Sequence, residues 1–320
     1  MKIFCILLFF INFQFYLPAE NVLLTSIADD RAGRKGGKYG ATQEKIYKVF
    51  LNNPNFGITH FQMWNWSDIE KTDFYKENRA LLDDLDVLKN SRAYKPYIIY
   101  KGLQSLQDGD FLIYTDTSPE LWSAIDENYV IDSNIYDLSV LKDLCKKNND
   151  ILTIHVKWDG DNHVPMGCPG RHTHAKFTLE RCMKKMGLLE YRNSLQHASG
   201  IWVICKSEDT LKFIEEWLYW NLFEECSIVG RASVPNDYSF AVEEGQSYDP
   251  VTLLELRPEA VSHRYDQSIS GLLINRRGNK LVEMPEDFWV TGLNPYNFLQ
   301  YARKNVIYTF MDSNFSEKQN

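Results

Sequence analysis

Residues 94–116 read YKPYIIYKGLQSLQDGDFLIYTD, and their pattern indicates an α/β fold. Helical spacing extends over 96–106, and the Asp-Gly-Asp sequence at 108–110 predicts a turn. The run 111–114 is apolar at every position, which is typical of a central parallel strand whose two faces are both covered. Asp116 stands two residues beyond that run. A helix, a turn and a buried strand in this order are the basic unit of an α/β sheet.

The sequence on either side continues this alternation of strands and helices. We predict further strands at 22–27, 58–63, 151–156 and 201–205, and further helices at 42–50, 67–90 and 208–223. Alternation over this length favours one domain with an open, mostly parallel sheet and helices on both faces.

The composition limits the possible partners. The chain has 35 basic and 43 acidic residues and a formal net charge of -8, with no long basic run. Binding to a nucleic-acid backbone needs a concentrated basic face, so we expect no nucleic-acid partner. Aromatic residues make up 14% of the chain, which suits both a deep core and stacking on sugar or nucleotide rings.

The amino terminus predicts entry into the secretory pathway. Lys2 precedes a nearly unbroken apolar stretch at 3–17 and the small residue Ala19 follows it, which is the layout of a signal peptide. We predict a signal peptide at 1–19, a globular domain at 20–320, and a location in the Golgi or ER lumen or outside the cell. A bilayer span needs about 20 apolar residues, so a short uncleaved signal anchor is the alternative. The protein would then be a single-pass type II membrane protein, with membrane contact only if 3–17 stay uncleaved.

Two further features would matter in that compartment. Asn65 and Asn314 begin Asn-x-Ser sequons, which are acceptor sites for N-glycosylation. The cysteines that remain after removal of residues 1–19 are odd in number and widely spaced. We expect one or two disulfides and at least one free thiol, with no pairing assigned.

Asp116 is the best-placed chemical group of the chain. Ligands in an open α/β sheet bind beyond the carboxyl ends of the strands, where this carboxylate should emerge. It suits a hard divalent cation that also touches phosphate oxygens, because such ions use one or two protein carboxylates. The alternative is that Asp116 only caps the turn at 117–119.

The second candidate is the segment 263–268, which reads HRYDQS. Asp266 lies three residues before Ile269, on the inward side of a predicted helix start. An acid at this position is often only a partner of the helix dipole. An inward acid beside His, Arg and Gln is also a candidate for holding or attacking a polar substrate.

Two loops carry weaker signals. One contains His163, Cys168, His172 and His174, but structural zinc sites pair their ligands at C-x2-4-C and H-x3-5-H spacings, so exposed histidines are the favoured interpretation. The basic loop at 31–38 follows the first strand without the spacing of a P-loop. Its cations either approach a phosphate or are simply solvated.

In order and spacing, these blocks resemble GT-A-type glycosyltransferases that use nucleotide-sugar donors. The similarity is carried by an aromatic-Lys-Pro-Tyr-Ile-Ile block at 94–99, by Gly-Asp, an apolar strand and Tyr-x-Asp at 109–116, and by His-Arg-x-Asp-Gln-Ser at 263–268. Weaker matches extend over residues 22–275.

The resemblance implies a single GT-A-like domain that transfers a sugar from a nucleotide-diphosphate donor to a hydroxyl acceptor on a glycan, protein or lipid. It also implies a divalent cation, with Mn²⁺ as the first candidate. The residues implied for donor binding are Ser26, Arg31, Lys95 and Asp116, those for the metal are Asp116 and His263, and those for catalysis are Asp266 and Gln267.

The chain departs from the family where an Asp-x-Asp motif is usual. It has Asp116-Thr117-Ser118, and a single carboxylate with hydroxyls holds a cation less firmly. A catalytically inactive carbohydrate-binding or nucleotide-binding protein of the same fold is the first alternative. A glycoside hydrolase, which needs two carboxylates about 5 to 10 Å apart, is the second. The Asp-Gln segment resembles that of retaining transferases, which favours retention over inversion.

Overall fold

The structure is a computed structural model of residues 1–320, and it describes residues 20–31, 38–83, 91–122, 128, 130, 131, 137–154, 173–227, 263, 265–283 and 309–311. Several predictions fall outside these residues. They concern the signal segment at 1–19, the loop residues His163, Cys168 and His172, and the sequon that begins at Asn314.

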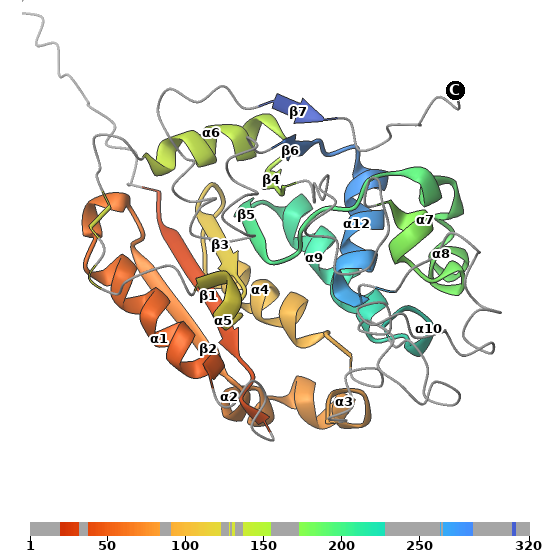
Figure 1. Ribbon diagram of the computed structural model, residues 1–320, viewed down its shortest axis with the longest axis horizontal. Coiled ribbons are helices and arrows are strands. Elements are labelled where there is room, and N and C mark those ends of the chain that lie inside the picture. The colour runs from red at the N-terminus through yellow and green to blue at the C-terminus, as the bar shows by residue number, and fades with distance from the viewer. Residues whose placement is uncertain are drawn as a thin grey trace, which may run out of the picture.

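A five-stranded sheet in the order β2-β1-β3-β5-β4 forms the centre of the described residues (Figure 1). Its strands are β1 (Val22–Ala28), β2 (His60–Asn65), β3 (Phe111–Thr115), β4 (Ile151–Leu152) and β5 (Ile201–Cys205). β1 is parallel to β2 and to β3, whereas β5 is antiparallel to β3 and to β4. The α/β prediction is confirmed, but the sheet is mixed and not mostly parallel. Because a fully buried strand is apolar on both faces in either direction, the sequence pattern does not reveal the reversal of β5.

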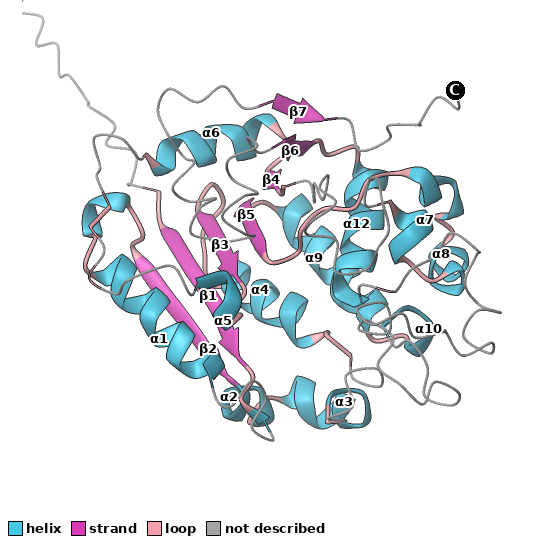
Figure 2. Ribbon diagram, viewed as in Figure 1, coloured by secondary structure: helices cyan, strands magenta, loops and turns pink. Residues whose placement is uncertain are grey.

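Helices cover both faces of this sheet, as predicted (Figure 2). Side chains alternate along β1, so that Val22 and Leu24 enter one hydrophobic cluster while Leu23 and Ile27 enter the other. The first cluster also takes in side chains of α1 (Lys38–Leu51) and α6 (Leu138–Lys147). The second takes in side chains of α4 (Tyr94–Gln104), α9 (Glu208–Asn221) and α12 (Tyr265–Arg277).

The other described helices are short. They are α2 (Trp66–Glu70), α3 (Asp73–Leu82), α5 (Pro119–Trp122), α7 (His174–Phe177), α8 (Glu180–Met186) and α10 (Glu224–Ser227), with 3-10 turns at Pro54–Phe56 and Leu189–Asn193. β6 (Leu281–Glu283) and β7 (Thr309–Met311) pair with each other in an antiparallel sheet of their own.

Most elements of the core lie close to their predicted bounds. The strand predicted at 151–156 is shorter, since β4 spans Ile151–Leu152 and residues 155 and 156 lie outside the described part. The strand predicted at 201–205 is β5, and the strand predicted at 111–114 is β3 with one more residue. The periodicity over 67–90 predicts a single helix, whereas the structure has two helices, α2 and α3, in the described part of this range. The break arises at Thr72, whose hydroxyl accepts a hydrogen bond from the backbone N–H of Tyr75 at 3.1 Å and so caps the start of α3.

The described cysteines Cys145, Cys182, Cys205 and Cys226 are free thiols, and all of them are buried. The expected disulfides are therefore not found among the described residues. Burial raises the pKa of Cys145 and of Cys182 well above the ordinary value for a thiol. These two sulfurs are protonated at neutral pH, and their surroundings are those of structural core cysteines.

Two further observations concern membrane spans and the first sequon. Among the residues that the structure describes, no helix has the length and apolar character needed to cross a bilayer. Asn65, the first sequon residue, is exposed at the start of α2, and the hydroxyl of Ser67 donates to its Oδ1 at 2.6 Å. This sequon thus lies on the surface.

Packing between helices places the start of α12 near the start of α4. α9 packs against both helices. Trp217 of α9 donates its indole N–H to the backbone carbonyl of Asp266 at 3.0 Å, which holds the first turn of α12 in place. The end of β3 and the turn before β5 meet at the same point, since the backbone N–H of Asp116 donates to the carbonyl of Gly200 at 2.8 Å.

Candidate functional site

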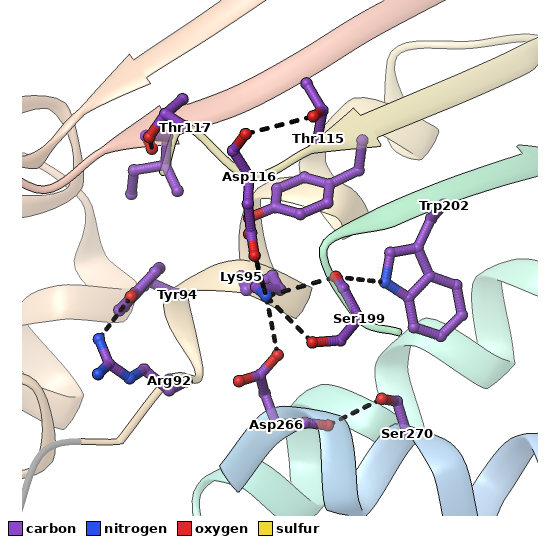
Figure 3. Close-up of polar contacts among 12 residues, drawn as sticks. Arg92, Tyr94, Lys95, Thr115, Asp116, Thr117, Ser199, Trp202, Asp266 and Ser270 are labelled. Carbon is purple, nitrogen blue, oxygen red and sulfur yellow. Dashed lines mark hydrogen bonds and ion pairs between the residues drawn. The ribbon is translucent and has the colours of Figure 1, made fainter. Parts of the chain in front are cut away.

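Lys95, Asp116 and Asp266 form one ion cluster at the carboxyl end of β3, which we call the Lys95 cluster (Figure 3). The Lys95 ammonium lies 3.1 Å from Asp116 Oδ1 and 3.0 Å from Asp266 Oδ2. It also lies 3.4 Å from the backbone oxygen and from the hydroxyl of Ser199. A single cation thus joins α4, the end of β3, the turn before β5 and the start of α12.

Asp116 is the most open member of the Lys95 cluster. Its side chain is 32% exposed, compared with 8% for Lys95 and 9% for Asp266. The hydroxyl of Tyr114 donates to Asp116 Oδ1 at 2.5 Å and fixes the direction of the carboxylate. Asp116 stands at the edge of the sheet where the sequence predicts it.

The position of Asp266 is set by the backbone at the start of α12. Tyr265, the residue before it, has a φ of 46°, which turns the chain sharply into α12. The carbonyl of Asp266 accepts hydrogen bonds from the indole of Trp217 at 3.0 Å and from the hydroxyl of Ser270 at 2.8 Å. With its backbone held in this way, the carboxylate is directed towards Lys95 (Figure 3).

Burial and charge act on Lys95 in opposite directions. Removal from water disfavours the ammonium, but Asp116 and Asp266 outweigh this effect and raise the pKa of Lys95 above its ordinary value. Burial, and then the charge of Asp116, raise the pKa of Tyr114 well above its ordinary value. At neutral pH, Lys95 is therefore charged, and Tyr114 keeps the proton that it donates to Asp116.

Gln267 lies next to Asp266 and joins a buried network of amides and hydroxyls. Its Nε2 donates to Gln196 Oε1 at 3.1 Å. The Nε2 of Gln196 in turn donates to the carbonyl of Phe177 at 3.0 Å and to the hydroxyl of Thr178 at 2.9 Å. The amide nitrogen of Gln196 is held by residues 177 and 178, so its amide oxygen is fixed in direction and orients Gln267.

Two residues predicted to bind the donor have other roles in the fold. Ser26 is fully buried between β1, β2 and α1, where it contacts the sulfur of Met63 and accepts a hydrogen bond from Gln43 at 3.1 Å. Arg31 binds both carboxylate oxygens of Asp29 at 2.8 Å and stacks over the ring of Trp66. The geometry argues against donor contact by Ser26. Arg31 connects the end of β1 to α2 through Asp29 and Trp66.

The predicted metal ligand His263 is also engaged. Its Nδ1 accepts a hydrogen bond from the backbone N–H of Leu179 at 3.2 Å, and its Nε2 lies 2.7 Å from the carbonyl oxygen of Cys226. Both ring nitrogens are thus used between α8 and α10. Burial lowers the pKa of His263 to about 3, so the ring is neutral and well satisfied without a metal. This geometry argues against His263 as a metal ligand.

The divalent cation implied by the resemblance does not fit the donor atoms of the described residues. No group of three His, Cys, Asp or Glu side chains converges within the described part of the chain. Asp116 and Asp266 are the two carboxylates that approach each other here, and both already share the ammonium of Lys95. A metal at Asp116 would have to share these carboxylate oxygens with that ammonium.

One cavity, of about 410 Å³, lies at the opposite end of the sheet. It is lined by residues at the amino ends of the strands, among them Leu23, His60 and Asp110. No member of the Lys95 cluster lines it. We place the candidate site at the Lys95 cluster because ligands of open α/β sheets bind at the carboxyl ends of strands, and because buried, paired charges gather there.

Tyr114 and Ser199 contact the site residues and were not among the predicted ones. Tyr114 could have been found, because residues two apart on a strand share a face and Tyr114 stands two before Asp116. Ser199 lies in a turn and reaches Lys95 only through the packing of β5 against β3, so no local pattern marks it.

The chain matches no family model, no curated protein and no solved structure.

Proposed function

We propose that this protein is a glycosyltransferase that moves a sugar from a nucleotide-diphosphate donor to a hydroxyl acceptor, on a GT-A-like variant of the α/β fold. The observation that carries the proposal is the Lys95 cluster. Lys95 belongs to the first sequence block of the resemblance, Asp116 ends the second, and Asp266 lies in the third. The third block is distant in the sequence from the first two, and the charged side chains of all three meet in one ion cluster.

The chemistry of such a transfer requires a positive charge at the leaving group. The bond between the anomeric carbon and the diphosphate oxygen breaks, and the bonding electrons remain on the diphosphate. The acceptor oxygen forms the new bond and gives its proton to the departing diphosphate. A fixed ammonium beside the diphosphate stabilises the charge that develops there, and preorganised charges of this kind commonly make the largest contribution to catalysis. In this proposal, Lys95 supplies that charge, and Asp116 and Asp266 hold it in position.

Asp266 and Gln267 both stand in the first turn of α12, where Asp266 contacts Lys95 and Gln267 contacts Gln196. We propose that Gln267, held by Gln196, contacts the transferred sugar, and that Asp266 acts mainly by orienting Lys95. Retention of configuration, the identity of the sugar and the secretory location remain predictions from the sequence. A glycoside hydrolase is disfavoured, because a sugar would have to sit between the two carboxylates and the ammonium of Lys95 already contacts both.

The test of the proposal is Asp116→Asn. Asparagine keeps the shape of the side chain and its contact with Tyr114, but removes one of the charges that hold Lys95. We expect sugar transfer from a panel of nucleotide sugars to fall by about a hundredfold or more, with the unfolding transition preserved. The matched control is Asp83→Asn. Asp83 also accepts hydrogen bonds from a tyrosine hydroxyl, that of Tyr75, and from a cation, Arg79, but it lies away from the site. Unchanged transfer by folded Asp116→Asn would refute the assignment.

A binding protein without catalysis is the second candidate. It is favoured by the burial of Asp266, which is 6% exposed and whose carboxylate contacts Lys95. Thermal-shift measurements with nucleotides and nucleotide sugars, followed by product detection, separate the two. Stabilisation by a nucleotide with no product from any donor would favour the binding protein.

A further inference from the structure

The geometry of Lys95 bears on whether the site uses a metal. Its side chain is 8% exposed, and its ammonium contacts two carboxylates and the two oxygens of Ser199. A buried ammonium is stable only when it is paired in this way. The ammonium of Lys95 is therefore the positive charge that Asp116 and Asp266 share.

The oxygens of Asp116 leave little room for a second cation. Oδ1 accepts the hydroxyl of Tyr114 at 2.5 Å and lies 3.1 Å from the Lys95 ammonium, and Oδ2 lies 3.4 Å from the same ammonium. Divalent ions bind carboxylate oxygens at about 2.0–2.6 Å, so an ion on Asp116 would lie close to a fixed positive charge. The residue two positions further on, where a second carboxylate is usual, is Ser118.

We propose that Lys95 is the resident cation of this site and that its ammonium binds the diphosphate of the donor directly, with no divalent ion ligated by Asp116. This inference rests on the proposed function and extends it to the cofactor. The two contacts from Lys95 to Ser199, at 3.4 Å, are longer than its 3.0–3.1 Å approaches to Asp266 and to Asp116 Oδ1, and in this proposal a phosphate oxygen replaces them. Lys95 then keeps its two carboxylates while it gains the diphosphate.

The first experiment measures binding of uridine, guanosine and cytidine diphosphates to the full chain by calorimetry, in excess EDTA and in excess MnCl₂. We expect at least one nucleotide to bind with a Kd that differs by less than about twofold between the two buffers, since a Mn²⁺ bridge would contribute far more. Binding that requires Mn²⁺ would overturn this inference and leave the glycosyltransferase proposal standing. Absence of binding in both buffers would count against the proposed function itself.

Substitution of Lys95 provides the second arm. Lys95→Met should weaken nucleotide binding by about tenfold or more, because a charged hydrogen bond to phosphate is lost. Lys95→Arg keeps the charge and should retain binding in EDTA. The matched control is Lys101→Met, on the same helix, whose exposed ammonium donates to Gln104 Oε1 at 2.9 Å. Equal binding by Lys95→Met and Lys101→Met would contradict a role for Lys95.

The third arm tests the metal directly in nucleotide-free protein by electron paramagnetic resonance of added Mn²⁺. We expect no Asp116-dependent Mn²⁺ binding by the unchanged chain. Lys95→Met should gain a Mn²⁺ site, because two adjacent carboxylates lose their counter-ion. If that variant does not fold, the measurement on the unchanged chain and on Asp116→Asn still decides the point. Mn²⁺ binding that Asp116→Asn abolishes would refute the proposal.

Discussion

At the scale of single residues, the hydrogen bond from Tyr114 to Asp116 is the contact that sets the geometry of the site. The two residues stand on the same face of the chain at the end of β3, and the bond is 2.5 Å long. Tyr114 is almost fully buried, so water does not compete with the carboxylate for its hydroxyl proton. Asp116 is thereby held towards Lys95.

We predict that Tyr114→Phe lowers sugar transfer by about tenfold to a hundredfold, because a hydrogen bond to a charged group contributes about 1.5–3 kcal/mol. The measurement is the transfer rate together with urea unfolding. Tyr75→Phe is the control, since it removes a tyrosine-to-aspartate hydrogen bond of the same kind from α3. If both variants lose the same amount of activity, the Tyr114 hydroxyl has no specific role in the site.

At the scale of elements, α12 packs against two buried histidines at Gly271. A Cβ at this position would lie 2.8 Å from the ring of His174 and 3.5 Å from the ring of His197. The ring of His174 is held by the hydroxyl of Thr178 at 2.7 Å, so it has little freedom to move away. The absence of a side chain at Gly271 is what lets α12 lie against these histidines with Asp266 beside Lys95.

We predict that Gly271→Ala destabilises the protein by about 1–2 kcal/mol, because overpacking of a core outweighs the better helix propensity of alanine. Urea unfolding measures this cost. In a His174→Ala background the clash is removed, so the same substitution should become neutral or stabilising. An equal cost in both backgrounds would show that His174 is not the group that limits the approach of α12.

At the scale of the whole molecule, two buried histidines join separate parts of the fold. His197 pairs with Ser270 of α12 at 2.7 Å, and His263 connects α8 to α10. Burial lowers the pKa of each histidine to about 3. Both rings therefore remain neutral in the folded protein at pH values where they are protonated in the unfolded chain, whose histidines titrate near about 6.5.

This difference predicts acid sensitivity between pH of about 3 and 6.5. In that range the unfolded state binds more protons than the folded state, so the free energy of unfolding falls as the pH falls. At pH 5 each histidine should cost about 2 kcal/mol of stability relative to neutral pH. Urea unfolding at the two pH values measures the change, and His197→Gln and His263→Gln should each remove part of it. A free energy of unfolding that is the same at pH 5 and at neutral pH would contradict the prediction.

The local elements of this protein can be predicted from the amino-acid sequence alone. The strands β1, β3 and β5 and the helices α4 and α9 lie close to where periodicity places them, because burial of one face or of both faces leaves a period that neighbouring residues share. The position of Asp116 at the end of a core strand follows from the same local pattern. Lys95, in the first turn of α4, and Asp266, in the first turn of α12, were also predicted as site residues.

Only the tertiary structure decided which of these groups touch. The direction of β5 follows from pairing with β3, and a buried apolar strand has the same pattern in either direction. Arg31 is held between the carbonyl of Leu82 and the ring of Trp66, and His263 is enclosed by residues 179 and 226. All of these neighbours are distant in the sequence. The pairing of one ammonium with both Asp116 and Asp266 has the same origin, because electrostatic contacts depend on distances in space, and packing of the sheet and helices sets those distances.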